Sequence, residues 1–205
     1  MDKWYDKVYL LLQAKYDKIQ PVNIIHSTKS RLYRAKKDGN NFFIKTIYQQ
    51  RKKYQLDFLS TERPCFMRYN VFLVEESGGG GENKSFGGGG ENKSFGGGRE
   101  NKSLKIILYN KESKEDEMVL HGGIILESAD CGEDTLTSLK VSAEYIFEVL
   151  EKAINQAHSE GYIFGDIKPE NIVVCGKDVR LIDIDEVAKR TDSERKNVST
   201  RFFRP

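Results

Sequence analysis

The chain has 205 residues, and its 33 Lys and Arg nearly balance its 31 Asp and Glu, leaving a net charge of +2. Apolar residues make up 38% of the chain, enough for a folded core, and no stretch is apolar for long enough to span a bilayer. This composition predicts neither a nucleic acid nor a membrane as partner.

The cysteines and the first residues bear on the cellular compartment. Cys65, Cys131 and Cys175 are odd in number and far apart, so we expect reduced thiols rather than disulfides or a zinc site. Residues 1–7 lack the basic start and apolar core of a signal peptide. We therefore expect an intracellular protein, cytoplasmic or nuclear.

The first elements in chain order are a short helix and three strands. Residues 4–16 have the pattern of an amphipathic helix, which we expect to pack on the sheet that follows. Strands are predicted at 23–25, 31–35 and 42–45, and an Asp-Gly pair before the last of them predicts a turn. The last strand ends in a lysine, Lys45.

A helix is predicted at 51–59, and strands are predicted at 66–74 and 104–108. Between these two strands the nonamer Gly-Gly-Gly-Gly-Glu-Asn-Lys-Ser-Phe occurs twice and is followed by a variant. The repeats, 78–103, hold 11 of the 18 glycines. Their apolar content is too low to offset the entropy lost on ordering, so we expect a flexible insertion.

An apolar strand and a long helix follow the repeats. The strand is predicted within 123–132, and the helix within 143–158. Apolar residues recur along this helix at helical spacing, which predicts a core-facing stripe. The stripe consists of Ile146, Phe147, Val149, Leu150, Ala153, Ile154 and Ala157.

The segment 161–185 is the most informative part of the chain. Asn171 follows Asp166 by five residues, Lys168 lies between them, and Asp183 comes twelve residues after Asn171. Phosphoryl transfer needs an oxygen to accept the proton of a hydroxyl, a cation near the phosphate, and oxygen ligands for magnesium. A polar loop with Asp and Asn as turn residues is the alternative. The spacing of all four residues favours phosphoryl transfer.

This segment resembles the catalytic loop and metal-binding strand of eukaryotic-type protein kinases, and the order of the other elements fits that family. The resemblance implies an α+β fold with two lobes. A β-rich small lobe and hinge would occupy 1–129, with 78–103 as an insertion. An incomplete helical large lobe would occupy 130–205, where 199–205 resemble the end of an activation segment.

The resemblance also implies a role for each residue of the site. Asp166 would orient the attacking hydroxyl and accept its proton, and Lys168 would stabilise phosphate charge. Asn171 and Asp183 would hold Mg²⁺. Lys45 would contact the phosphates of ATP, as the lysine of the corresponding kinase strand does.

The strand within 123–132 would run into the hinge between the lobes. Leu126 would then be the gatekeeper, and backbone groups of Glu127 and Ala129 would meet the adenine ring. The kinase pattern also requires a glutamate from the helix at 51–59 to pair with Lys45. Gln55 falls at that position, Asp57 and Glu62 are the alternatives, and the sequence does not choose among them.

Three positions depart from the kinase pattern. The loop expected to cover the phosphates reads His-Ser-Thr-Lys-Ser at 26–30 and contains no glycine. Gly165 stands where kinases have the arginine that binds a phosphorylated activation loop. Asp185 replaces the glycine that normally follows the metal-binding Asp by two residues.

From these features we expect transfer of the ATP γ-phosphate to a Ser or Thr hydroxyl of a protein substrate. Lys168 and the sequence Lys-Pro-Glu-Asn at 168–171 resemble Ser/Thr rather than Tyr kinases. The main alternative is a pseudokinase or kinase fragment that binds partners without catalysis, which the loop at 26–30 favours. A small-molecule kinase is a third possibility.

Overall fold

The computed structural model describes residues 2–22, 30–49, 51–77, 103–112, 122–132, 142–176, 178–185 and 187–190. Its helices are α1 (Asp2–Lys15), α2 (Lys53–Ser60), α3 (Ala143–Ser159) and the 3₁₀ turn η2 (Pro169–Asn171). Its strands are β1 (Lys18–Pro21), β2 (Ser30–Lys37), β3 (Asn40–Ile47), β4 (Asn70–Ser77), β5 (Ser103–Leu108), β6 (Ile124–Ala129), β7 (Tyr162–Ile163), β8 (Ile172–Cys175), β9 (Asp178–Leu181) and β10 (Ala188–Lys189).

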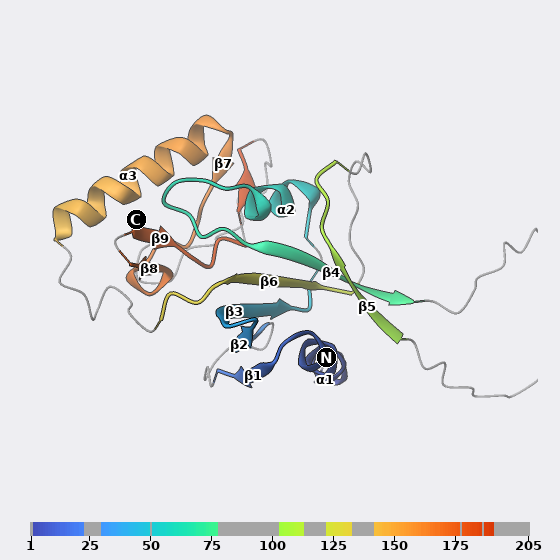
Figure 1. Cartoon of the computed structure of the whole chain (residues 1–205). Helices are drawn as coiled ribbons and strands as arrows, with labels where there is room; N and C mark the ends of the chain where they lie inside the picture. Colours follow the sequence, from blue (N-terminus) through green and yellow to red (C-terminus); the bar gives the residue numbers. More distant parts are fainter. Residues whose placement is uncertain are drawn as a thin grey trace, which may run out of the picture.

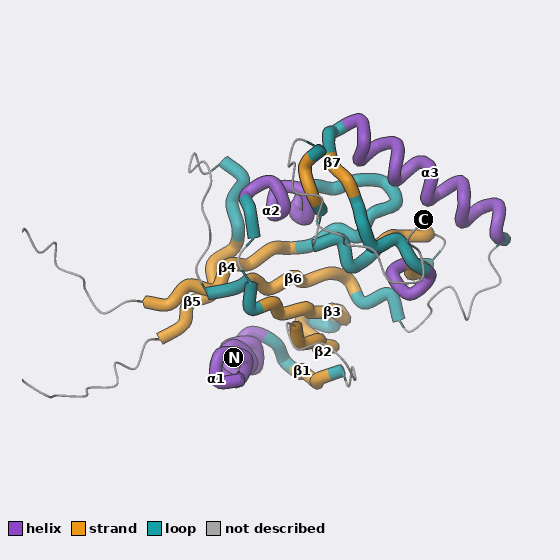
Figure 2. Tube along the Cα trace, turned by 180° about the vertical axis from the view of Figure 1, so that it is seen from behind, coloured by secondary structure: helices purple, strands orange, loops and turns teal. Residues whose placement is uncertain are grey.

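The first six strands form one antiparallel sheet in the order β1-β2-β3-β6-β4-β5 (Figure 1). β6 therefore lies in the interior of the sheet, between β3 and β4. α1 packs against one face of this sheet, and α2 lies on the other side, toward the second half of the chain (Figures 1 and 2). This β-rich part confirms the expected α+β class.

The turn between β2 and β3 agrees with the prediction from its sequence. Asp38 and Gly39 adopt φ angles of 50° and 80°. A two-residue hairpin loop favours positive φ at both positions, which Asp-Gly tolerates well. The hairpin aligns Leu32 opposite Lys45, so the local turn sets the register of the strand that carries this lysine.

The predicted N-terminal helix is confirmed, and it packs on the sheet as expected. Trp4, Val8 and Leu12 are buried and recur every four residues, which places them on one helical face. They pack against side chains of the sheet such as Ile44. Gly123 permits this contact, because a Cβ added there would lie 2.6 Å from the Trp4 ring.

The second half contains α3 and two short β-pairs. Ser142 begins the helix by accepting a hydrogen bond from the Tyr145 amide at 3.3 Å. Val149, Ala153 and Ala157 are its buried residues. Phe147 departs from the predicted core stripe, because it is 70% exposed and lies off the line that these three residues make along the helix.

β8 and β9 form a hairpin that connects the second half of the chain to the segment before β4. Phe66, in the connection between α2 and β4, makes an isolated bridge with Leu181 at the end of β9. Backbone hydrogen bonds on both sides of it join Met67 N to Leu181 O at 2.9 Å and Leu181 N to Cys65 O at 2.8 Å. One hydrophobic core therefore runs from α2 and β4 through β8 and β9 to α3.

The expectation of reduced thiols is wrong for two of the three cysteines. Cys131 and Cys175 form a disulfide, with their Cα atoms 4.7 Å apart. Cys65 is the free cysteine. The two paired residues are 44 positions apart in sequence and meet because the chain folds the end of β8 beside the segment after β6. Spacing along the sequence carries no sign of that contact.

No helix in the described ranges is long and apolar enough to cross a membrane.

Candidate active site

The loop 164–171 joins β7 to β8 and carries three of the predicted site residues. Lys168 Nζ lies 2.7 Å from Asp166 Oδ2. The Asn171 amide nitrogen donates to the same Asp166 oxygen at 3.1 Å and to the Asp166 backbone carbonyl at 2.9 Å. Because the Asn171 side-chain nitrogen faces Asp166, the side-chain oxygen Oδ1 is directed away from that carboxylate. The Asp-x-Lys-x-x-Asn spacing thus closes one polar cluster.

The 3₁₀ turn η2 explains how this short loop closes. Pro169 begins the turn, where its fixed φ is favourable and its missing N–H is not needed. The backbone N–H of Asn171 then donates to the backbone carbonyl of Lys168 at 2.9 Å. This turn brings the Asn171 side chain back toward Asp166.

Asp183 follows β9 and is brought to the same place by the β8–β9 hairpin. Ile172 pairs with Leu181 across that hairpin, and the Ile182 amide donates to the Asn171 carbonyl at 2.8 Å. Asp183 has a φ of 58°, in the left-handed region. A non-glycine residue rarely adopts this conformation, and such residues cluster at functional sites.

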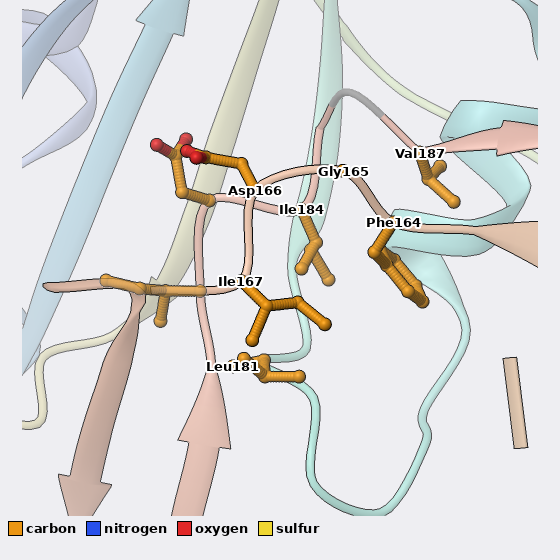
Figure 3. Close-up of a pocket in the computed structure, with 9 residues that line it drawn as sticks. Phe164, Gly165, Asp166, Ile167, Leu181, Ile184 and Val187 are labelled. Carbon is orange, nitrogen blue, oxygen red and sulfur yellow. The ribbon is translucent and has the colours of Figure 1, made fainter. Parts of the chain in front are cut away.

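A small cavity separates the loop 164–171 from the Asp183 segment. Its volume is about 20 Å³, room for roughly one water molecule. Figure 3 shows Ile167, Leu181 and Ile184 around it, while the Asp166 carboxylate points away from these apolar side chains. Asp183 also lines the cavity, so residues of both segments border one space.

Aromatic contacts fix the start of this loop. The Phe164 ring lies 5.2 Å from the ring of Phe58 on α2 and 5.2 Å from that of Phe66. Phe58 also meets Tyr162 at 4.8 Å. The two pairs made by Phe58 are edge-to-face and the Phe66–Phe164 pair is tilted; aromatic pairs at these distances add to the energy of burial. α2 is thereby packed directly against the residues that precede Asp166.

Lys45 reaches this site from β3. It forms an ion pair with Asp183, and its Nζ lies 2.6 Å from Asp185 Oδ1. Burial alone would lower the pKa of Lys45, but the charges of Asp185 and Asp183 outweigh it and raise that pKa above the usual value. Lys45 is therefore a cation held between two carboxylates.

The two aspartates have different surroundings. The side chain of Asp183 is 42% exposed, whereas that of Asp185 is 5% exposed and also pairs with Arg51. Burial favours the neutral acid at Asp185, yet Lys45 and Arg51 outweigh it and hold the pKa of Asp185 below its usual range. Partial burial of Asp183 raises its pKa. The positive charge of Lys45 opposes this rise, the negative charge of Asp185 adds to it, and the pKa of Asp183 is raised overall.

The three residues considered as partners of Lys45 have partners elsewhere. The Gln55 amide donates to the Val187 carbonyl at 3.0 Å. Asp57 accepts a hydrogen bond from Tyr109 at 2.8 Å, and Glu62 pairs with Arg68 at 3.2 Å. Asp185 and Arg51 are the residues that sequence reasoning did not place in the site. The replacement of a kinase glycine by Asp185 was the signal that could have found them.

The predicted hinge residues lie on β6. Leu126 is buried directly opposite Lys45. Glu127 faces Ile44 on β3 and Asn70 on β4, so its backbone lies inside the sheet. Ala129 lies beyond the last β4–β6 pair and is exposed, which leaves its backbone at the margin of the sheet.

The Glu127 side chain points toward α1, on the face away from Lys45. It accepts hydrogen bonds from Tyr16, from Lys15 Nζ at 3.0 Å and from Asn70 at 2.8 Å. Burial alone would raise the pKa of Glu127, but these hydrogen bonds and the Lys15 charge lower it overall. Its side chain therefore attaches α1 to the sheet, a role that the sequence did not indicate.

Four predicted features lie outside the described residues, in whole or in part. They are the strand at 23–25, positions 26–29 of the loop expected over the phosphates, residues 78–102 of the expected flexible insertion, and residues 199–205 of the expected activation segment.

Comparison with known proteins finds solved structures of similar shape. No protein family model matches this chain. No curated protein matches it either. The chain is similar to the structure of the Cydia pomonella granulovirus kinase PK-1, with a TM-score of 0.48 and 15% identity. The match covers 92% of this chain and 60% of PK-1, so the chain spans less than two thirds of that kinase. What this site does is therefore inferred from its own side chains.

The donor set fits magnesium better than a softer metal. Asp183 offers a partly exposed carboxylate, and Asn171 offers an amide oxygen because its nitrogen is already bonded to Asp166. Magnesium prefers such oxygen ligands and keeps several waters of its own. Within the described ranges, no three His, Cys, Asp or Glu side chains gather as a metal site.

Proposed function

We propose that this chain transfers the γ-phosphate of ATP to a hydroxyl group of a protein substrate. The observation that carries the proposal is the convergence of two segments on one small cavity. The loop 164–171 brings Asp166, and the segment after β9 brings Asp183, to which Lys45 is paired. A base, a cation and a metal-ligand carboxylate are the parts that phosphoryl transfer requires.

Asp166 is the general base of this proposal. Lys168 and Asn171 both contact its Oδ2, and these contacts orient the carboxylate that would accept the proton of a substrate hydroxyl. A positioned base must lie within hydrogen-bond reach of the proton that it removes. Lys168 lies beside this oxygen and stabilises negative charge on the phosphate during transfer.

Lys45 and the oxygen ligands bind the phosphate donor. Lys45 is partly buried, with 18% of its side chain exposed, so its charge acts through a medium less polar than water. Magnesium held by Asn171 and Asp183 would neutralise charge on the phosphates. The backbone of Ala129, at the margin of the sheet, is the open candidate for a contact with adenine.

The Lys-Pro-Glu-Asn sequence at 168–171 resembles that of Ser/Thr protein kinases. This resemblance supports Ser or Thr as the acceptor and a protein as the substrate. An intracellular site of action, cytoplasmic or nuclear, stays part of the proposal, and the Cys131–Cys175 disulfide is the observation against it, because such bonds are rare in the cytosol and nucleus.

Transfer of radiolabelled phosphate from magnesium-ATP to a mixed pool of Ser- and Thr-containing peptides tests the proposal. Asp166→Asn should lower the rate by about 10²- to 10⁴-fold, because the amide cannot accept the proton. Glu170→Gln is the matched control, since Glu170 is exposed in the same loop and should leave the rate unchanged. An Asp166→Asn variant that transfers phosphate at the wild-type rate would remove the proposed mechanism.

A non-catalytic binding module is the second candidate, and one observation favours it. Lys45 already has two carboxylate partners, so a nucleotide phosphate must compete with Asp183 for it. Thermal unfolding with and without magnesium-ATP separates the two functions, because a bound ligand raises the apparent stability of the native state. Stabilisation that requires Asp183, without phosphate transfer, would identify a nucleotide-binding pseudokinase. If magnesium-ATP gave no stabilisation and no phosphate were transferred, the chain would be a module that does not use nucleotide.

A further inference from the structure

Asp185 is the most buried acidic group of the site, and its two carboxylate oxygens have separate cationic partners. Oδ1 lies 2.6 Å from Lys45 Nζ, and Oδ2 lies 2.6 Å from Arg51 Nη2. Arg51 is itself only 4% exposed. Charge-assisted contacts on both oxygens fix the rotation of the carboxylate as well as its position.

Asp183 is the more solvent-exposed of the two carboxylate partners of Lys45. Its side chain is 42% exposed, so water competes for its oxygens, and the proposed function gives it a second task as a metal ligand. Asp185 has no exposed surface of that size. A phosphate or metal that draws Asp183 away therefore leaves Lys45 with Asp185 as its fixed partner.

α2 does not supply a carboxylate to Lys45. The residue at the expected position is Gln55, whose amide nitrogen lies 3.0 Å from the Val187 carbonyl and 3.5 Å from that of Asp185. Gln55 thus holds the backbone of the segment that carries Asp185. Arg51, just before α2, holds the Asp185 side chain. Gln55 and Arg51 therefore both contact Asp185 or its backbone, and neither replaces a carboxylate partner of Lys45.

We propose that Asp185 is the positioning residue for Lys45, in the place of the glutamate that α2 does not supply. Its carboxylate, oriented by Arg51, holds the Lys45 ammonium at the entrance of the site where a phosphate would bind. The functional part of this inference rests on the proposed phosphotransfer, but the contact itself does not.

The contact is tested by NMR of the lysine side-chain ammonium groups in the whole chain labelled with ¹⁵N-lysine. A buried, paired ammonium exchanges its protons slowly and gives a signal, which Lys45→Arg assigns by its disappearance. The signal should persist in Asp183→Asn and vanish in Asp185→Asn. An absent signal in the wild type, or one lost in Asp183→Asn and kept in Asp185→Asn, overturns the proposal.

Asp185→Asn leaves Arg51 buried without its carboxylate, so this variant can fail to fold. The double variant Arg51→Gln/Asp185→Asn removes both charges and leaves two amide side chains that can form hydrogen bonds. Cooperative thermal unfolding identifies which variants are folded. The Lys45 signal should be absent from the folded double variant, and its persistence there contradicts the role of Asp185.

Kinetics then test the consequence for transfer. Asp185→Asn should lower kcat by about 100-fold, the cost typical of a misplaced catalytic group, with a smaller change in the KM for ATP. Because Asp185 acts through Lys45, the double variant Lys45→Met/Asp185→Asn should be no slower than Lys45→Met alone. Additive losses would show that Asp185 acts independently of Lys45. A wild-type chain without transfer would refute the proposed function, while the NMR comparison would still decide the contact.

Discussion

Ser77 and Ser103 face each other as the final antiparallel pair between β4 and β5, although residues 78–102 of the glycine-rich repeat lie between them in the sequence. The repeat therefore leaves and re-enters the fold at one point, the open end of a hairpin at the edge of the sheet. A chain that leaves and returns at one point imposes no separation on the strands, so its length is free to vary.

Deletion of the repeat should stabilise the fold. Replacing residues 78–102 by a two-residue Asn-Gly turn shortens the loop about twelvefold, which should raise the free energy of unfolding by about 2 kcal/mol through lower closure entropy. Urea unfolding measures this change as a higher midpoint with an unchanged slope. A shuffled repeat of equal length is the control and should behave as the wild type does. A lower midpoint after deletion would show that the repeat makes stabilising contacts.

The attachment of α1 through Glu127 should make stability depend on pH. Folding lowers the pKa of Glu127 from its ordinary value of 4.5, so its contribution is complete above about pH 4.5 and is lost as the pH falls through the folded-state value. Glu127→Gln should lower the free energy of unfolding by about 1–3 kcal/mol at pH 7. The difference from the wild type should shrink below about pH 4.5.

Urea unfolding at a series of pH values measures the effect of Glu127→Gln. Glu75→Gln, on an exposed position of β4, is the matched control and should change stability little at any pH. A loss at Glu127 that stayed constant down to pH 3 would mean that the ionised carboxylate contributes nothing to the attachment of α1.

Much of the fold follows from local signals in the sequence. The Asp-Gly turn at 38–39 demands positive φ angles, and the apolar spacing of the first helix fixes the face that it buries. Long-range contacts have no such signal. The pairing of Cys131 with Cys175 depends on how β6 and β8 are brought together, and the exposure of Phe147 depends on which side of α3 meets the core.

The residues of the site also divide into those that local sequence predicts and those that only long-range contacts bring together. Asp166, Lys168 and Asn171 belong to one short loop, so their spacing was enough to predict that they meet. The partner of Lys45 was not predictable, because it comes from a segment 140 positions away, and the helix pattern pointed to Gln55. Only the fold brings Asp185 and Arg51 to the same lysine.

The disulfide between Cys131 and Cys175 should contribute substantially to stability. A link across 44 positions removes entropy from the unfolded chain worth about 4 kcal/mol in the loop-closure treatment. Thiol titration of the denatured, unreduced chain should find one thiol, that of Cys65, and three after reduction. Reduction, or Cys175→Ser, should then lower the free energy of unfolding by up to this amount.

Cys65→Ser is the control for the disulfide and should leave the effect of reduction intact. Three thiols titrated before any reductant is added would mean that the purified chain does not form this bond.

The aromatic contacts of Phe164 should couple stability to the geometry of the site. Phe164→Ala removes a half-buried ring between Phe58 and Phe66, so we expect a loss of about 2 kcal/mol, less than the ~3–5 kcal/mol of a fully buried phenylalanine. Because Phe164 precedes Asp166 by two residues, the loop also loses its fixed starting point. Phosphate transfer by the folded fraction should therefore fall, while Phe164→Leu, which keeps most of the volume, should recover much of both.

Phe147→Ala is the matched control for Phe164, since it removes the same ring from a position that is 70% exposed. Surface changes of this kind usually alter stability by less than about 0.5 kcal/mol. Urea unfolding and single-turnover transfer on the same preparations separate the two effects. If Phe147→Ala cost as much stability as Phe164→Ala, the exposed side of α3 would carry packing of its own. If Phe164→Ala lost stability but kept the wild-type rate, the aromatic contacts would support the fold without positioning Asp166.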